Sequence, residues 1–558
     1  MKQLFISAVL SLVLVAPILS TSTAVAQQKS PTIGVLSIAS FERVMGDVGL
    51  IAELSDNAGR LKKFRKQVEP FLAAIDTSKP AGVLLRTDGE EEFWAVGFAP
   101  VSDVKKLVDM VEAADVDVDI ELADGFYTAT GPNGKTINAK AQGDWLFIAE
   151  KKSQLTNLPK DPAKLLGPLP KEYVVAARLN VQAVPALQRN KALAMLDEKI
   201  ADVQQSLPGE SDDDFKARMA IFGAQMESIR ALVKDVDKVT LGWAVDKKSK
   251  STYVDLSVTA VAGSDTAKTF SAYENTTSDH GGFLLPGAAL NIHFSSNMPE
   301  REIKQSLTML DFARKQILEK FEDGAPLPDE KSKDQALQVI AKLLDVFRDT
   351  IKEGKMDGGA VFVLKPGNSS IVAGGRVADG ADLDKAFREF VALASKLDDD
   401  FPDVKFDAET YQGVNFHTLS IPLDEDDKAA KVFGEKLNVA IGSGKKSFYV
   451  AFGKDALGSV KQVIDLSKKN AGKKLPPAQL ALAVGPIVKF AASIDEENPA
   501  LLMASFLVAQ AKDKDHVRIV VRQIKNGISY RIELEEGLIR IIGQASKFAQ
   551  GLGGGPGL

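Results

Sequence analysis

The sequence predicts an α+β protein of two tandem related modules, each a mostly antiparallel sheet with helices packed on one face. Three observations predict this class. Segments of 32–275 and 286–548 follow nearly the same order of strands and helices. Many predicted strands are joined by short turns rich in Gly, Asn, Asp and Pro, which favours antiparallel hairpins. The helical patterns are grouped instead of alternating with single strands, which is typical of α+β proteins.

The chain is accordingly divided at its composition changes. We predict a signal peptide over 1–26, module A over 27–275, a linker over 276–285 and module B over 286–548. The last ten residues, 549–558, are rich in Gly and predict a disordered tail.

The N-terminus has the pattern of a secretory signal. Lys2 precedes an apolar run over 4–19, and the small residues Ala24 and Ala26 stand where a signal peptidase reads, with Gln27 next. A transmembrane anchor is the alternative, but the run is short for a span and no stop-transfer flank follows. The chain has no Cys, which excludes a lipoprotein anchor. We expect a periplasmic or secreted product of a Gram-negative-type bacterium.

Each module opens with a strand and two helices. In module A, an apolar run predicts a strand and two helical patterns follow it. Module B repeats this order. The ranges are 33–38, 41–55 and 58–75 in module A, and 288–294, 300–322 and 331–353 in module B.

A hairpin and a helix come next in both modules. The hairpin strands are 82–87 with 92–98, and 359–364 with 370–377. Ser102 or Asp103 is expected to cap the helix of module A, and Asp382 that of module B, because each precedes apolar residues at three-and-four spacing.

Strands close both modules. The predicted ranges are 144–149, 173–179, 239–245 and 252–260 in module A, and 447–452, 480–484, 517–524 and 528–534 in module B. Strand 252–260 alternates, with Asp255 among polar residues at every second position and Leu256 among apolar ones. This pattern predicts that the polar side faces solvent and the apolar side faces the core.

Composition excludes several chemistries. Without Cys there is no disulfide, thiolate nucleophile or Cys-ligated metal. Hydrophobic content of 45% and charged content of 26% are ordinary for a globular protein. The formal charge is −6 and no basic block stands out, so neither nucleic acid nor a polybasic route to anionic lipid is expected.

Short motifs give no firm chemistry. Residues 129–136 match a relaxed phosphate-loop pattern, but strand-like residues follow where a helix is needed, so a hairpin turn is favoured. Residues 115–119 resemble the start of a calcium loop but lack its Gly and its bidentate acid, which favours a solvated strand. The acidic runs 212–214, 398–400 and 424–427 are expected to be solvated loops.

The four histidines, His280, His293, His417 and His516, have no metal-ligand spacing, and no nucleophile elbow is present. His293 and His417 alternate with apolar residues on predicted strands. We expect strand histidines of this kind to face solvent or to make one hydrogen bond. A triad assembled from distant residues stays open but nothing favours it.

All three tryptophans, Trp94, Trp145 and Trp243, fall on predicted strands of module A. Core packing is the default for strand aromatics. A ligand-lining face particular to module A is the alternative.

The signal peptide, the Leu-Pro pairs at 169–170 and 475–476, and the hairpin–helix–strand order carry a resemblance. On these features the chain resembles exported bacterial proteins of unknown function with duplicated α+β modules. The resemblance implies a fold and brings no catalytic residues.

These observations favour an exported, non-enzymatic binding or scaffolding protein of the cell envelope. We expect it to bind an apolar ligand or a protein partner between its halves, because ligand sites favour domain interfaces. No cofactor or metal is expected. A hydrolase with an unrecognised site and a passive surface or assembly protein are the alternatives. The oligomeric state is left open.

Overall fold

The computed structural model describes residues 31–113, 118–132, 134–201, 206, 211–324, 329–424, 428–511 and 514–552. The chain is α+β with mainly antiparallel strands, as predicted. It forms two compact units. Unit 1 comprises 1–200, 235–261 and 531–558, and unit 2 comprises 201–234 and 262–530. The C-terminal helix therefore belongs to the unit that holds the first strand, while the division into modules at 275 and 286 stays a prediction.

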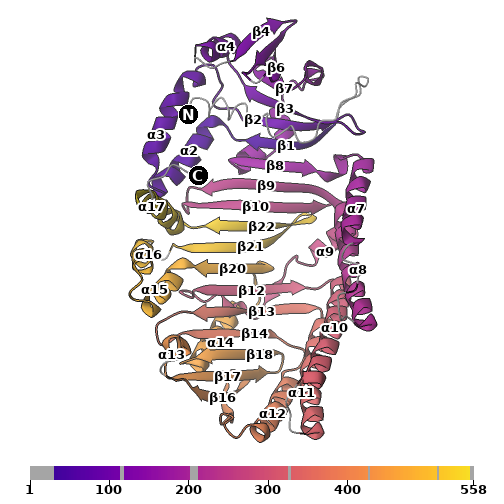
Figure 1. Cartoon of the computed structure of the whole chain (residues 1–558), viewed down its shortest axis with the longest axis vertical. Coiled ribbons are helices and arrows are strands. Elements are labelled where there is room, and N and C mark those ends of the chain that lie inside the picture. Colours follow the sequence, from indigo (N-terminus) through magenta and orange to yellow (C-terminus); the bar gives the residue numbers. More distant parts are fainter. Residues whose placement is uncertain are drawn as a thin grey trace. The chain divides into compact units, whose positions relative to one another are not determined.

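Unit 1 contains ten antiparallel strands in the order β10-β9-β8-β1-β2-β3-β7-β6-β5-β4 (Figure 1). Their bounds are β1 Thr32–Ile38, β2 Ala81–Thr87, β3 Phe93–Pro100, β4 Asp119–Ala123, β5 Phe126–Thr130, β6 Thr136–Gln142, β7 Trp145–Ala149, β8 Val175–Asn180, β9 Val236–Asp246 and β10 Ser251–Ala260. The last residues of β22 (Gly527–Leu534) pair with β10.

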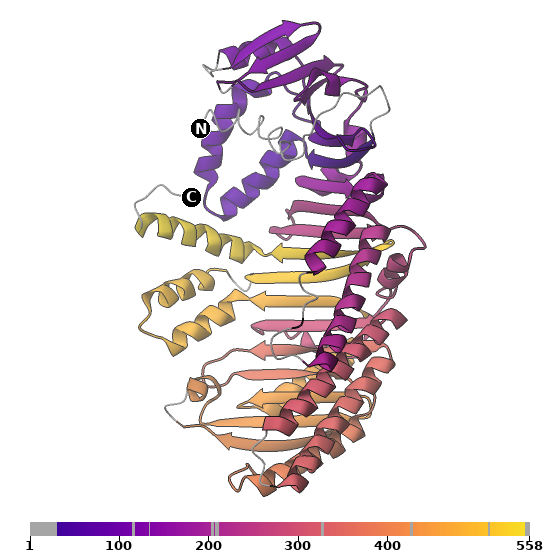
Figure 2. The same ribbon diagram turned by 45° about the vertical axis from the view of Figure 1, so that its right-hand side comes forward.

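Two helices of unit 1 begin at side-chain caps, and the cap at Asp103 is one that the sequence predicts. The Ser40 hydroxyl accepts from the Arg43 N–H at the start of α2 (Phe41–Leu54), and the Asp103 carboxylate accepts from Lys106 at the start of α4 (Val104–Glu112). Helix α3 (Ala58–Leu72) follows α2 after a tight turn, and Figure 2 shows the two diverging from it. The remaining helices are η1 Lys152–Leu155, α5 Ala163–Leu166, α6 Leu169–Glu172, η2 Val181–Ala183, α7 Ala186–Ala201 and α17 Glu536–Leu552.

The core of unit 1 covers one face of its sheet. Val35, Leu84 and Ala244 point from the strands toward η1, α5 and α6, which contribute Leu155, Leu166 and Leu169. Phe98, Trp145 and Phe147 fill the same cluster, with ring centroids of Phe98 and Trp145 5.6 Å apart. The face on the other side of these strands carries the site described below.

Unit 2 shows the same strand pairing pattern, in the order β21-β20-β12-β13-β14-β18-β17-β16-β15. The strands are β12 Leu290–Asn297, β13 Lys355–Val363, β14 Ser370–Arg376, β15 Lys405–Tyr411, β16 Val414–Pro422, β17 Lys436–Gly444, β18 Ser447–Gly453, β20 Ala478–Ala483 and β21 His516–Ile524. Strands β11 (Thr277–Ser278) and β19 (Lys473–Lys474) form a separate pair. This agreement with unit 1 supports related modules, which remain a prediction.

The helices of unit 2 are α8 Asp212–Asp235, α9 Asp265–Ser271, η4 Gly281–Phe283, α10 Glu300–Gly324, α11 Glu330–Lys352, α12 Gly380–Leu397, α13 Lys428–Phe433, α14 Ala456–Asn470, α15 Val484–Ile494 and α16 Pro499–Ala509. One predicted cap is wrong. Asp379 caps α12 by accepting from the Ala381 N–H, and Asp382 lies inside the first turn. Gly380 and Ala381 were not recognised as helical because a Gly-Ala pair carries no apolar periodicity.

The predicted linker 276–285 is an ordered part of the unit 2 core. Phe283 is fully buried against Val463 and other residues of α14. A Cβ on Gly282 would lie 1.9 Å from the Val463 carbonyl oxygen, so only glycine fits there.

The chain ends differ from their predicted bounds or lie outside the description. Helix α17 extends to Leu552, past the predicted start of the tail at 549, because Ala549 and Gln550 continue the helix. The predicted cleavage residues Ala24, Ala26 and Gln27 lie outside the described residues. Among the helices described, none combines the length and apolarity needed to cross a bilayer.

Candidate functional site: an open apolar sheet face

Four neighbouring strands of unit 1 align apolar side chains in rows. Opposite residues on antiparallel strands project to the same side of a sheet. Across β1, β8, β9 and β10 the register gives three rows, which we call the apolar sheet face. The rows are Ile38–Val175–Trp243–Val254, Leu36–Ala177–Leu241–Leu256 and Gly34–Leu179–Val239–Val258.

The centre of this face is exposed. Leu241 and Leu256 lie directly opposite each other and are 51% and 41% exposed. Val175, Leu179 and Val254 are also exposed, and none of the twelve positions is charged. Three strand spacings of about 4.8 Å make the face roughly 14 Å wide. A continuous exposed apolar surface of this kind indicates a ligand-binding or interaction site.

The alternation of β10 is as predicted, but its two faces are reversed. Asp255, expected in solvent, is only 5% exposed, whereas Leu256, expected in the core, belongs to the open face. A bulge between Thr259 and Ala260 returns Ala260 to the buried side. The prediction was wrong because periodicity identifies two faces and cannot tell which one is covered.

A buried polar network explains how Asp255 is tolerated inside. Arg531 donates from Nε and Nη2 to the two Asp255 carboxylate oxygens, each at 2.7 Å, and the Tyr173 hydroxyl donates to Oδ2 at 3.2 Å. The Arg531 guanidinium also lies 3.7 Å from the centroid of the Tyr253 ring. Burial, with the Asp255 charge, raises the pKa of Tyr173, so it stays a neutral donor. Paired in this way, a buried carboxylate avoids most of its desolvation cost.

Trp243 presents an apolar surface to the open face. Its indole N–H donates to the Thr252 hydroxyl at 2.7 Å, and that hydroxyl donates to the Ala244 carbonyl oxygen at 3.1 Å. The only polar atom of the ring is therefore already bonded within the protein. What remains for a ligand is a flat, partly exposed hydrocarbon-like ring between Val175 and Val254.

The other two tryptophans lie elsewhere. Trp145 is buried in the unit 1 core, and Trp94 packs against the same cluster from β3. The structure thus does not bring the three tryptophans together on one surface. Of the three residues considered as ligand-lining, Trp243 alone lies on the apolar sheet face.

His293 lies in a buried cluster with the composition of a catalytic triad. Ser278 Oγ is 2.9 Å from His293 Nε2 and donates to Asp357 Oδ1 at 2.6 Å. It also accepts from the His280 N–H at 2.9 Å. Since the hydroxyl proton goes to Asp357, Nε2 of His293 is the donor to Ser278. His293 therefore does not act as a base on this serine, and Nδ1 is buried without a partner among the described residues.

Ser278 and His293 are fully buried, so no substrate reaches them. Burial lowers the pKa of His293, against the opposing charge of Asp357, and keeps the ring neutral. Burial likewise lowers the pKa of His280, whose Nδ1 is 3.2 Å from the Tyr449 hydroxyl. His293 therefore makes one hydrogen bond, which is one of the two outcomes expected for a strand histidine. Its burial was not predicted, because its polar partners lie far away in the sequence.

His417 lies on β16 and is also buried, against α12. Its Nδ1 accepts from the Asp407 N–H at 3.0 Å, so Nε2 carries the proton that is donated to Asp384. Phe387 stacks on the ring with centroids 5.6 Å apart. Arg388 joins Asp384 and Asp407 at 2.8 and 2.6 Å. Despite burial, the hydrogen bonds from Arg388 and His417 hold the pKa of Asp384 below its usual range. The cluster fixes α12 on the sheet.

The remaining motifs are structural. The motif at 129–136 falls where β5 and β6 pair as a hairpin, and the Gly131 N–H donates to the Lys135 carbonyl oxygen at 3.0 Å. Asn133 lies outside the described residues. Asp119 begins β4, whereas Asp115 and Asp117 lie outside the described residues. Residues 212–214 begin helix α8, so the prediction of a loop there was wrong. Residues 398–400 are exposed and follow the end of α12, and of 424–427 only Asp424 is described. No group of three or more His, Asp or Glu in the described part of the chain is arranged to hold a metal.

Comparisons with known proteins add no function. No family model matches the chain, and no curated protein matches it. A solved structure of TP0453, crystal form IV, aligns with 41% of this chain and 78% of its own, at 9% identity and a TM-score of 0.21. A similarity at that level carries no argument about fold or activity.

The sequence contained a signal for the apolar sheet face that periodicity alone does not reveal. In β1, residues 33–36 are apolar or Gly at every position, and in β9 Val239, Leu241 and Trp243 alternate with Gly242 and Ala244. A strand with apolar side chains on both sides lies in a sheet that other elements cover on both faces, or it has one apolar face that nothing covers. Only the structure distinguishes these two cases, because it shows which helices cover which face.

Proposed function

We propose that the protein is an exported, non-enzymatic binding protein of the cell envelope, and that it binds an aliphatic ligand on the apolar sheet face. The observation that carries the proposal is the reversal of β10, which buries Asp255 and exposes Leu256 beside Leu241. Burying a charged network while two leucines stay exposed to water is unfavourable in free energy. A ligand that covers the leucines offsets this cost. The predicted signal peptide supports the location.

An acyl chain suits this surface better than a polar ligand. The three rows offer no charge, and the Trp243 N–H is already bonded to Thr252. A ligand bound here gains from apolar area removed from water and makes no hydrogen bond to the rows. The rival hypothesis of a hydrolase is not supported by Ser278 and His293, which are buried and wrongly hydrogen-bonded for nucleophilic attack.

The test is equilibrium binding of a fluorescent fatty acid to the full chain. We expect Leu241→Asn with Leu256→Asn to weaken binding at least roughly tenfold, because the bound ligand loses its apolar contacts with two leucines. Leu122→Asn is the matched control: Leu122 is an exposed leucine on β4 of the same unit, away from the three rows. We expect it to bind like the wild type.

Equal binding by both variants would contradict the proposal. A second copy of the chain is the other occupant to be tested. Sedimentation of the unliganded wild type distinguishes the two: a dimer that the double variant disrupts, without any fatty-acid binding, would assign the face to self-association.

A further inference from the structure

Helix α3 of unit 1 is strongly basic, although the chain is acidic. Five of its fifteen residues are cationic and one is acidic, which gives +4, against −6 for the whole chain. The cations are Arg60, Lys62, Lys63, Arg65 and Lys66. They fall within seven consecutive residues, a local run that the overall charge conceals.

These cations are directed to solvent. Lys62, Lys63, Arg65 and Lys66 are exposed and form no ion pair within the described residues. Only Val68 of α3 is buried, so most of the helix surface is accessible. Some other surface lysines of unit 1 are paired with carboxylates, for example Lys79 at 2.9 Å and Lys191 at 2.6 Å. The charge of these four side chains is available to a partner.

Apolar side chains accompany the charge. Phe64 lies between Lys63 and Arg65 in the sequence and is 40% exposed. A helix with a cationic polar face and an exposed aromatic residue is typical of binding in the plane of a membrane surface. Lysine and arginine stems reach past such a residue while their charges stay in the headgroup layer.

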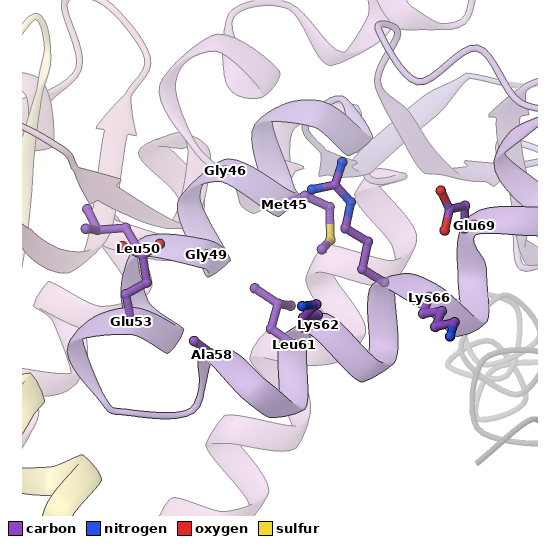
Figure 3. Close-up of a pocket in the computed structure, with 11 residues that line it drawn as sticks. Met45, Gly46, Gly49, Leu50, Glu53, Ala58, Leu61, Lys62, Lys66 and Glu69 are labelled. Carbon is purple, nitrogen blue, oxygen red and sulfur yellow. The ribbon is translucent and has the colours of Figure 1, made fainter.

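A cleft of about 830 Å³ lies between α2 and α3. Met45 and Leu61 point into the space between the helices, and Lys62 lies next to Leu61 (Figure 3). Gly46 and Gly49 of α2 also line the cleft, and the Gly49 backbone faces the Leu61 side chain. The lining also includes Arg65 and Lys66, with Glu53 and Glu69 at other points.

We infer that α3 docks unit 1 on the surface of a bilayer that contains anionic phospholipid. The lipid phosphate lies in the cleft beside Lys62, Arg65 and Lys66, and Phe64 enters the interface. Charge complementarity and the adjoining apolar lining select an anionic amphiphile over a neutral one. The inference goes beyond the proposed ligand site and does not depend on it, because none of its residues belongs to the apolar sheet face.

The test is sedimentation of the full chain with vesicles of phosphatidylglycerol and phosphatidylcholine or of phosphatidylcholine alone. Each surface cation contributes about a fivefold gain in binding to anionic membranes. We therefore expect Lys62→Gln with Lys66→Gln to weaken binding to the anionic vesicles about 25-fold. The control pair is Lys105→Gln with Lys106→Gln, two exposed lysines of α4 in the same unit. Any contribution of the N-terminal apolar run is common to all variants.

Two further arms complete the experiment. Phe64→Ser should weaken vesicle binding without altering the denaturant midpoint, and salt at about 1 M should release the wild type, since the Debye length falls to about 3 Å. Equal loss in both lysine pairs, or equal binding to neutral vesicles, would overturn the inference. Release from vesicles by millimolar inorganic phosphate would assign the cleft to a soluble anion and also overturn it.

Discussion

Gly242 illustrates how one residue determines which sheet face is covered. A Cβ at this position would lie 2.5 Å from the Tyr173 ring. The ring therefore packs directly on the backbone of β9, and its hydroxyl reaches Asp255. The missing side chain on one face of β9 allows the polar network to form there, and the leucines are left on the other face.

We expect Gly242→Ala to lower the free energy of unfolding by about 1–3 kcal/mol, because the added methyl group overpacks the Tyr173 contact. The denaturant midpoint measures this. Gly59→Ala is the control, since Gly59 has no atom within 4 Å of an added Cβ and lies in α3. That variant should gain up to about 1 kcal/mol from helix propensity. A neutral Gly242→Ala would show that Tyr173 does not pack as described.

His293 predicts a pH dependence of stability. Its pKa is lowered by burial, so the folded state binds fewer protons than the unfolded state once the pH falls below the usual His value of about 6.5. Stability is therefore present above that value and declines as the pH falls toward the lowered pKa. His280 contributes in the same direction.

The measurement is the unfolding free energy between about pH 8 and about pH 5, on either side of the His value. His293→Gln lacks one of the two buried rings whose pKa is lowered, so its decline should be shallower by up to about 1.4 kcal/mol per pH unit. Parallel curves for the variant and the wild type would mean that His293 takes up its proton equally in both states.

Among the elements, β10 and the end of β22 depend on one ion pair. Arg531→Leu removes both hydrogen bonds to Asp255 and leaves a buried carboxylate with Tyr173 as its remaining side-chain donor. We expect a loss of about 3–5 kcal/mol. Lys547→Leu, which removes an exposed pair with Asp56 in the same unit, should cost no more than about 1 kcal/mol. Similar losses in both variants would contradict the role of the network.

The elements themselves were largely predictable. Strand β1 and helices α2 and α10 begin within two residues of their predicted starts, because apolar periodicity is a local signal. The core contacts of Phe283 and the burial of His293 were not predictable, since their partners are distant in the chain. The same holds for the apolar sheet face: the alternation of β10 was evident, but which side is buried depends on Tyr173 and Arg531.

The basic run of α3 was visible in the sequence. It was missed because the charge was judged over the whole chain, whose formal charge is −6.

For the whole molecule, the order of strand pairing recurs in the two units, and the surface chemistry differs. Unit 1 carries the apolar sheet face and the basic helix α3, whereas unit 2 contains the buried histidine clusters. We propose that unit 1 binds ligand and membrane, and that the histidines of unit 2 serve its stability. The proposed function depends on the exposed surfaces of unit 1 and not on a cluster of catalytic residues.

The most direct measurement uses Trp243 as a reporter. Trp94→Phe with Trp145→Phe leaves Trp243 as the only tryptophan of the chain. With a brominated fatty acid, we expect saturable quenching of the Trp243 fluorescence, and loss of that quenching when Leu241→Asn is added. Absence of saturable quenching in a folded double variant that still binds the fatty acid would place the ligand elsewhere and contradict binding on the apolar sheet face.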